Sequence, residues 1–297
     1  MVNGRAMAIP AAIFALATAL GSAFVLAAAL PGGRFENREM PAPALRQADR
    51  DCRVYLPPSY DQPAAAHRRY PVVVFLHGWP GSEGNWPGQG HVGETLDRLI
   101  RSHAIPEVIG LFPDGGGSGH LGRGMWLDGA PGESQLETYL MRDLPRWADA
   151  TFRTIPEARM RGVIGLSDGG TGAINAALRH PSVYGAAGSH SGVFRLQPDW
   201  SSGPLFEDGA AGDRRRAEYS PLEYLPAFAD SARRVTLYFD CGRDDETFRD
   251  NVELDSLLTA LRVPHEWHAF HGSHEWSYWR THIEESLRAV TKGMRDE

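Results

Sequence analysis

Lysine and cysteine are scarce in this chain of 297 residues, and its basic residues are outnumbered by its acidic ones. Lys292 is the only lysine, and 37 acidic residues against 30 basic ones leave a formal charge of −7. A chain of this balance lacks the basic surface that nucleic-acid binding requires, which excludes nucleic-acid partners. The two cysteines, Cys52 and Cys241, stand in no C-x-x-C or histidine-flanked arrangement, so they indicate neither metal nor redox chemistry.

A long uncharged segment lies near the N-terminus. Residues 6–30 carry no charge and consist mostly of Ala, Leu, Ile, Val and Phe, a pattern typical of an export signal. Small residues at 27–29 offer a cleavage site, but the segment is also long enough to span a bilayer. Residues 1–33 are therefore predicted to be a cleaved signal or a membrane anchor. The rest of the protein should act outside the cytoplasm, secreted or periplasmic, and touch a membrane only through this segment if it is retained.

The remainder is predicted to be a linker over residues 34–50 and one folded domain over residues 51–297. Strands are expected at 52–56, 71–77, 108–112, 161–164, 185–191, 235–240 and 265–270, and helices at 91–103, 134–151, 170–178, 221–229, 247–261 and from about 276. Residues 194–220 are polar and are expected to form a surface insertion. The alternation predicts an α/β fold, a doubly wound and mostly parallel sheet with helices on both faces and no large separate cap domain. Because Cys52 and Cys241 fall on distant strands of such a sheet, we expect two buried thiols.

The most informative motif is G-x-S-x-G at residues 165–169. An apolar strand pattern precedes it, and a run of small residues with a helical pattern follows it. Strand, G-x-S-x-G and helix together indicate a nucleophile elbow, a tight turn that lifts the serine hydroxyl above the sheet edge. These flanks favour the elbow over an ordinary glycine-rich loop, and Ser167 is the predicted nucleophile.

A serine nucleophile needs a base to take its proton and a third group to orient that base. In α/β-hydrolases the acid and then the histidine follow the serine, each after the end of a later strand. The strand predicted at 235–240 runs into three acidic residues. We predict Asp245 as the acid, because it lies three residues after the turn glycine Gly242. Asp244 is the first alternative and Glu246 the second.

Histidines recur along and after the last predicted strand. His274 follows the strand at 265–270 and is the predicted base, with His271 as the alternative. A metal tract is disfavoured, since His265 and His268 would point to opposite faces of a strand. No carboxylate or cysteine lies at zinc-like spacing beside the two later histidines either. The sequence therefore predicts no metal and no other cofactor.

An oxyanion hole requires two backbone N–H donors. The amide of Asp168, directly after the nucleophile, is the first. The second should come from the turn after the strand that ends at His77. Pro80 has no N–H, which leaves Gly78 or Trp79, and we favour Trp79. The ring of His77 is expected to support this turn, and His77 is disfavoured as the base because it precedes the serine in the sequence.

Aromatic residues near the predicted site would suit an aryl, acyl or sugar group. The residues expected to line a substrate pocket are His77, Gly78, Trp86, Trp126 and Trp276. Packing within the core is the alternative for the three tryptophans.

Seven stretches match one family in combination. They lie at residues 54–60, 75–78, 112–115, 137–139, 165–170, 178–181 and 272–279, the last with the pattern G-x-H-x-W-x-x-W. On these residues the chain resembles the putative-esterase family of α/β-hydrolases, which includes S-formylglutathione hydrolases of the esterase D type, feruloyl esterases and mycolyltransferases. The resemblance implies a triad of Ser167, Asp245 and His274. It also implies an oxyanion hole at Trp79 and Asp168. The family usually has a methionine in place of Asp168 and often an aliphatic residue in place of Trp79, and we expect the Asp168 side chain to turn away from the oxyanion.

These features predict a serine hydrolase that cleaves carboxylic esters through an acyl-enzyme, with a small-molecule or glycan-linked ester as its substrate. An acyltransferase that moves an acyl group to a sugar or glycerol hydroxyl is the alternative that the mycolyltransferase resemblance allows. A catalytically silent binding protein is a third hypothesis, which the complete serine, acid and histidine set disfavours. A metal-dependent hydrolase is the last.

Overall fold

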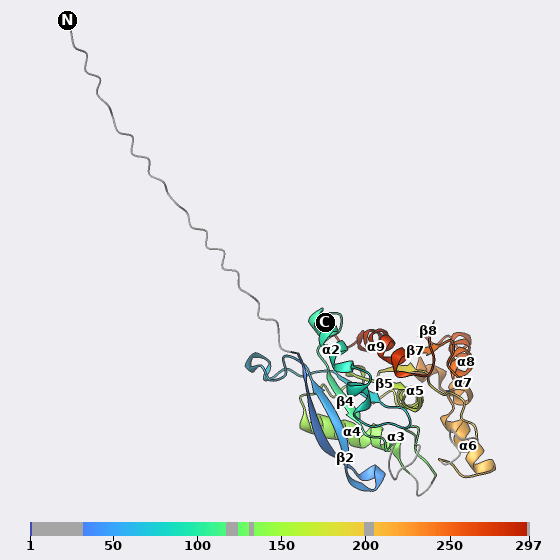
Figure 1. Ribbon diagram of the computed structural model, residues 1–297. Coiled ribbons are helices and arrows are strands. Elements are labelled where there is room, and N and C mark those ends of the chain that lie inside the picture. The colour runs from blue at the N-terminus through green and yellow to red at the C-terminus, as the bar shows by residue number, and fades with distance from the viewer. Residues whose placement is uncertain (2–31, 117–123, 131–133, 199–204, 296–297) are drawn as a thin grey trace.

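The computed structural model describes residues 1, 32–116, 124–130, 134–198 and 205–295. Within these residues the strands form one sheet in the order β1-β2-β4-β3-β5-β6-β7-β8 (Figure 1). They are β1 Arg34–Ala42, β2 Gln47–Leu56, β3 Val72–Leu76, β4 Ile109–Pro113, β5 Arg161–Leu166, β6 Ala186–His190, β7 Thr236–Gly242 and β8 Glu266–Phe270. Strand β2 pairs antiparallel with β1 and β4, and the other pairings of the described sheet are parallel.

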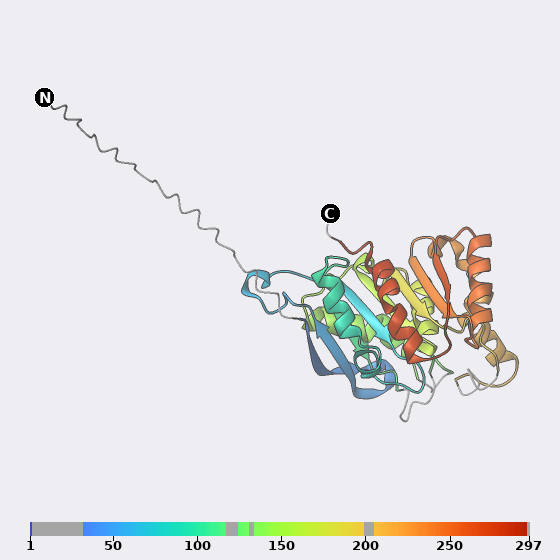
Figure 2. The same cartoon turned by 45° about the horizontal axis from the view of Figure 1, so that its top comes forward.

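Helices cover both faces of this sheet (Figure 2). They are α1 Asn85–Gly88, α2 Val92–Arg101, α3 Leu136–Thr138, α4 Leu144–Thr151, α5 Asp168–Arg179, α6 Ala210–Tyr219, α7 Pro221–Ala232, α8 Phe248–Ala260 and α9 Trp276–Thr291. Helices α2 and α9 pack on one face, in a cluster with Val73 and Phe75 of β3. Helices α4, α5, α7 and α8 share the other cluster with the alternate residues Val72 and Val74. The predicted doubly wound α/β sheet is confirmed.

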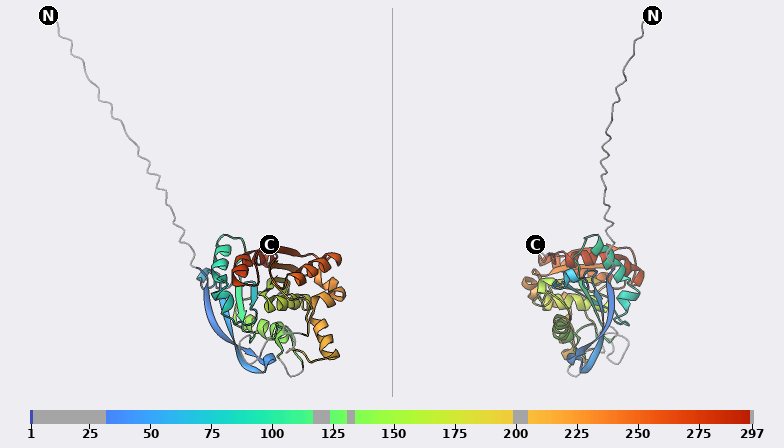
Figure 3. Two further views of the ribbon diagram at one scale, coloured as in Figure 1. Left: turned by 45° about the vertical axis from the view of Figure 1, so that its right-hand side comes forward. Right: turned by 90° about the vertical axis from the view of Figure 1, so that its left-hand side faces the viewer.

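The prediction of a linker over residues 34–50 is wrong. Strand β1 pairs along the whole of β2 in an antiparallel hairpin at one edge of the sheet, and residues 47–50 are the start of β2 (Figure 3). Most of β1 is exposed, and only Met40 and Ala42 are buried. An exposed edge strand is free to be polar and to contain Pro41, because one side of an edge strand has no ladder partner. The hairpin therefore lacked the apolar pattern by which the other strands were predicted.

The long helix predicted at 134–151 is interrupted. The structure has the short α3, then a π-helical turn at Tyr139–Asp143, then α4. Pro145 lies in the first turn of α4 and has no N–H to donate to a carbonyl of the preceding turn. The wider turn accommodates that missing hydrogen bond. The predicted insertion at 194–220 likewise contains a helix, α6.

Several predictions concern segments that the described residues cover only in part. The predicted signal or anchor at residues 6–30 lies outside them, as do residues 199–204 of the predicted surface insertion. No helix of the described part of the chain is long and apolar enough to span a membrane. Cys52 on β2 and Cys241 on β7 are both free and buried, as predicted.

The sheet order also locates the site. The chain runs from β3 outward to β4 and then crosses back to β5 on the other side of β3. In parallel sheets, crevices that bind ligands form outside the carboxyl ends of strands at such a reversal of order. Ser167 directly follows β5 at this point.

Candidate active site

Ser167 connects β5 to α5 with φ +53° and ψ −122°, a backbone conformation that side-chain-bearing residues rarely adopt. The two glycines of the motif explain how the turn closes. A Cβ atom on Gly165 would lie 2.0 Å from the carbonyl oxygen of Gly169. One on Gly169 would lie 2.3 Å from the carbonyl oxygen of Leu76, at the end of β3. Both obstacles are backbone atoms, so only glycine fits, and the packed surroundings hold Ser167 in its strained conformation.

The structure brings the three predicted triad side chains together. His274 Nε2 lies 2.9 Å from Ser167 Oγ, and His274 Nδ1 lies 3.0 and 3.1 Å from the two Asp245 carboxylate oxygens. Since a carboxylate only accepts hydrogen bonds, Nδ1 carries the proton and Nε2 faces the serine hydroxyl with its lone pair. In this arrangement the histidine can take the serine proton while the carboxylate stabilises the imidazolium that forms.

The alternative acids and base that the sequence allowed are not brought to this point. Asp244 and Glu246 flank Asp245 but are exposed, and His271 is exposed as well. Asp245 is only 6% exposed. Burial thus distinguishes Asp245, the acid that bonds His274, from its two acidic neighbours.

Asp245 is held by donors that sequence reasoning missed. The backbone N–H and the hydroxyl of Thr247 both donate to its Oδ1, at 2.8 Å each. The hydroxyl of Ser191 also interacts with the carboxylate. Burial alone would raise the pKa of Asp245, but the hydrogen bond and charge of His274, together with these donors, hold it below its ordinary value. The Asp-x-Thr spacing, typical of an Asx turn, was the available signal for Thr247.

Trp279 contacts both the base and the group that supports the acid. Its ring lies edge-to-face with His274, with 4.9 Å between ring centroids. Its Nε1–H donates to Ser191 Oγ at 3.0 Å, and it is 6% exposed. This residue is the second tryptophan of the G-x-H-x-W-x-x-W pattern, to which the sequence analysis assigned no role.

The segments predicted to supply the oxyanion-hole amides flank the nucleophile. A Cβ atom on Gly78 would lie 3.1 Å from Ser167 Cβ, so the turn after β3 runs directly beside the serine. Trp79, the next residue, is 47% exposed. On the other side, Asp168 is the first residue of α5, and amides in the first turn of a helix point out of its N-terminal end. The Asp168 residue itself is buried, at 2% exposed.

His77 supports the turn that carries Trp79. Its Nδ1–H donates to the carbonyl oxygen of Gly78 at 2.7 Å, and its Nε2 accepts the N–H of Gly115 at 3.0 Å. Its backbone carbonyl accepts the indole N–H of Trp126 at 2.9 Å. Both ring nitrogens are therefore engaged with the two loops that follow β3 and β4, which agrees with a supporting role for this histidine.

The structure places two of the three predicted pocket tryptophans in the core. Trp86 is 1% exposed and donates its N–H to the Leu76 carbonyl, and Trp126 is 3% exposed. With so little free surface they pack at the carboxyl end of β3, which is the core packing that the sequence left open as the alternative to lining a pocket. Trp276 is partly buried and lies edge-to-face with Trp86 and Trp279.

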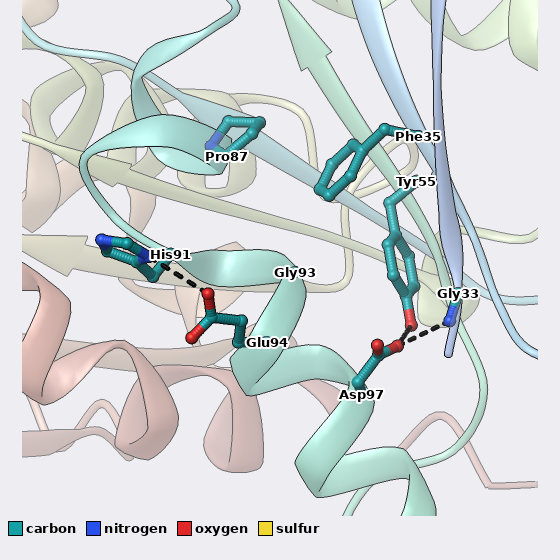
Figure 4. A pocket seen from close by; sticks show the side chains of 8 residues that line it. All are labelled: Gly33, Phe35, Tyr55, Pro87, His91, Gly93, Glu94 and Asp97. Atoms are coloured by element: carbon teal, nitrogen blue, oxygen red, sulfur yellow. Dashed lines mark hydrogen bonds and ion pairs between the residues drawn. The ribbon is translucent and has the colours of Figure 1, made fainter. Parts of the chain in front are cut away.

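A separate cavity of about 240 Å³ lies between the edge hairpin and α2 (Figure 4). It is lined by Gly33, Phe35, Tyr55, Pro87, His91, Gly93, Glu94 and Asp97. Asp97 accepts the N–H of Gly33 and the hydroxyl of Tyr55, both at 2.7 Å. These hydrogen bonds link the start of β1 to α2. None of the residues that line the cavity belongs to the triad.

A mostly parallel sheet with a nucleophile elbow after β5, an acid after β7 and a histidine after β8 defines an α/β-hydrolase. The sequence matches the model of the putative-esterase family over residues 44–290, and the chain belongs to that family. The resemblance inferred from the motifs is thereby confirmed.

Two curated relatives illustrate the match. The chain is 33% identical over 251 residues to an uncharacterized protein of Corynebacterium glutamicum. This match covers 82% of this chain and 57% of that protein. It is 27% identical over 249 residues to an esterase of Mycobacterium tuberculosis, which covers 74% of this chain and 51% of that one. The chain thus spans about half the length of these relatives.

Solved structures agree with the fold. A ferulic acid esterase superposes with a TM-score of 0.78 and 26% identity, covering 89% of this chain and 99% of its own. An S-formylglutathione hydrolase from Agrobacterium tumefaciens gives a TM-score of 0.73 with 19% identity, covering 89% and 96%. At 19% identity, the second comparison shows only that the two folds are alike.

Proposed function

We propose that this protein is a serine hydrolase that cleaves carboxylic esters through an acyl-enzyme. The observation that carries the proposal is the 2.9 Å contact between Ser167 Oγ and His274 Nε2, with Asp245 on the other nitrogen of the same ring. An isolated serine hydroxyl is a weak nucleophile, and this contact supplies the base that activates it. Membership of the putative-esterase family supports the same activity.

The arrangement supports a two-step reaction. Ser167 Oγ attacks the ester carbonyl while His274 takes its proton, and the oxyanion that forms is stabilised by the amides of Trp79 and Asp168. Collapse of this intermediate breaks the ester bond, and His274 protonates the departing alcohol. Water then attacks the acyl-enzyme with His274 as the base, which releases the carboxylic acid and restores Ser167.

The direct test is the Ser167→Ala variant. Turnover of p-nitrophenyl acetate should fall on the order of 10⁶-fold, to background, because the nucleophile is removed. A fluorophosphonate probe should label the wild-type protein and not the variant. Retained turnover by a folded Ser167→Ala protein, or failure of the wild type to be labelled, would contradict the proposal.

Acyl transfer is the second candidate. A diacylglycerol acyltransferase/mycolyltransferase of Mycobacterium leprae is 23% identical over 207 residues, covering 58% of this chain and 61% of that one. The same acyl-enzyme would serve both reactions, and the acceptor would decide between them. Product analysis with trehalose or glycerol present distinguishes the two. Acylated trehalose or glycerol indicates a transferase, and free acid alone indicates a hydrolase.

For the substrate we propose an ester with an aryl or sugar-linked part, tested with a panel of acetyl, feruloyl and longer acyl esters. Trp79 is half-exposed and follows Gly78, whose backbone runs beside Ser167, so it offers an aromatic surface to such a group. The ferulic acid esterase of similar fold supports the inclusion of feruloyl esters. Equal rates across the panel would argue against this selectivity.

We also propose that the protein acts outside the cytoplasm. The uncharged segment at residues 6–30 after Arg5 supports export, either with cleavage or as an anchor. N-terminal sequencing of the protein from culture medium, periplasm and membrane fractions separates these cases. An intact chain found in the cytoplasm alone would contradict export.

A further inference from the structure

A second set of serine, histidine and aspartate lies wholly buried between β6, β7 and α9. His190 and Asp240 are both 0% exposed. His190 Nδ1–H donates to the Asp240 carboxylate at 2.9 to 3.0 Å, and its Nε2 lies 2.9 Å from Ser286 Oγ. The same carboxylate accepts the hydroxyls of Tyr238 at 2.8 Å and Tyr278 at 2.9 Å. Since no part of the pair reaches the surface, these residues cannot bind a substrate themselves.

Such a buried pair contributes more to holding its surroundings in one geometry than to the free energy of unfolding. Desolvation of two buried polar partners offsets much of their attraction, so a buried pair is weak evidence for net stabilisation. A fully hydrogen-bonded network does rigidify its surroundings. Here the Asp240 carboxylate receives donors from three elements, β6, β7 and α9.

His190 joins this network to the nucleophile. It ends β6, where it pairs in register with Leu166 on β5 and with Asp240 on β7. Its backbone carbonyl accepts the N–H of Ser167 at 2.8 Å. The one residue therefore holds the strained elbow through its backbone while its side chain is fixed by Asp240.

Tyr278 joins the network to the segment of the base. Its ring packs against Gly272, where a Cβ atom would lie 2.7 Å from Tyr278 Cδ2. Its backbone N–H donates to the carbonyl of Glu275 at 3.1 Å. Gly272 and Glu275 lie on either side of His274, so Tyr278 contacts the segment of the base both before and after it. The bond from its hydroxyl to Asp240 ties this contact to the sheet.

We propose that the buried His190–Asp240 pair is a positioning unit that holds Ser167 and His274 at reacting distance, and that Tyr278 is the residue through which it holds His274. The inference rests on the proposed hydrolase function, because its effect is on the distance across which the proton moves. It predicts that weakening the Tyr278 link slows the chemical step without changing substrate binding.

The test compares Tyr278→Phe with Tyr238→Phe. Each variant removes one hydroxyl donor from the same carboxylate, but only Tyr278 belongs to the segment of His274. Both variants should lower Tm by similar amounts. Tyr278→Phe should lower kcat for p-nitrophenyl acetate about tenfold, since small misplacements of reacting groups cost rate steeply. KM should stay within about twofold, and the rate of Ser167 labelling by a fluorophosphonate should fall with kcat. Tyr238→Phe weakens the same carboxylate but leaves its link to the segment of His274 intact, so its kcat should fall no more than about twofold.

The outcomes separate this inference from the proposed function. If the wild type neither turns over esters nor reacts with the probe, the proposed function is wrong and the positioning unit has no reaction to serve. If the wild type is active and Tyr278→Phe matches it, or if both variants lose kcat equally, the positioning role of Tyr278 is wrong. A loss of kcat confined to Tyr278→Phe, at a temperature well below both Tm values, supports it.

Discussion

Asp245 shows how burial gives one carboxylate a role that its neighbours lack. Asp244 and Glu246 have the same chemistry and lie one residue away, but they are exposed. Asp245 instead accepts hydrogen bonds from Thr247 and His274 in a buried position. Its negative charge is thereby kept next to the imidazolium that forms during the reaction, with little screening by solvent.

Replacing this carboxylate should therefore be far more costly than replacing its neighbour. In Asp245→Asn the amide cannot stabilise the imidazolium, and kcat for p-nitrophenyl acetate should fall about 10⁴-fold while the fold is retained. Asp244→Asn is the matched control and should stay within about twofold of wild type, because this side chain is solvated. Steady-state kinetics with circular dichroism checks both. Equal losses of kcat in the two variants would show that Asp245 is not the acid of the triad.

At the scale of the element, the elbow depends on how closely α5 approaches the end of β3. The backbone of Gly169 runs so near Leu76 and His77 that a Cβ atom would lie 2.3 and 2.6 Å from their carbonyl oxygens. Those carbonyls belong to the same turn that continues into Gly78 and Trp79. A shift of α5 would consequently displace the nucleophile and the oxyanion segment relative to each other.

Gly169→Ala tests this dependence. The added methyl group meets backbone atoms that cannot rotate away, so the free energy of unfolding should drop by about 1–3 kcal/mol. The kcat should fall about 10²-fold, because the elbow is displaced. Gly88→Ala is the control, since a Cβ atom there has no neighbour within 4 Å. The control should have the same free energy of unfolding as the wild type, or a slightly higher one, and should keep the wild-type kcat. An active and stable Gly169→Ala protein would contradict the account of the elbow.

On the scale of the whole molecule, local patterns predicted the centre of the sheet and the residues that follow its strands. The elbow was predictable because its apolar strand, its glycines and its small-residue helix are adjacent in the sequence. The edge strand β1 was not, because exposure removes the apolar pattern from residues such as Asn37 and Arg38. The burial of Trp86 was not predictable either, because its N–H bonds a carbonyl ten residues away, at the end of β3. The buried pair of His190 and Asp240 forms only when β6 and β7 align.

Glu137 connects helices that are far apart in the sequence. Its carboxylate accepts Arg179 Nε at 2.7 Å, His180 Nε2 at 2.8 Å and the hydroxyl of Tyr219 at 3.0 Å. These partners belong to the end of α5 and to α6, whereas Glu137 lies in α3. Burial alone would raise the pKa of Glu137, but the hydrogen bonds and charges of His180 and Arg179 lower it to about 2.

This shift predicts how the stability of the whole molecule depends on acid. The pKa of Glu137 is lower in the folded state than its ordinary value of 4.5, so its contribution is present above pH 4.5 and is lost as pH falls toward 2. The contribution amounts to about 3 kcal/mol, at about 1.4 kcal/mol for each unit. In Glu137→Gln, the deficit in unfolding free energy relative to wild type should be largest at pH 7 and should shrink steadily below pH 4.5.

Denaturant titrations at pH 7, 5, 4 and 3 measure this deficit directly, and Glu157→Gln is the matched control. Glu157 also pairs with an arginine, Arg159, at 2.8 Å, but both side chains are more than half exposed. A solvated pair contributes about 0–1 kcal/mol, so the control should differ little from wild type at every pH. Only a buried carboxylate with several donors can give a deficit that closes between pH 4.5 and 2. A deficit for Glu137→Gln that stays constant across the titrations would show that the Glu137 side chain stabilises the helices by its packing and not by its negative charge.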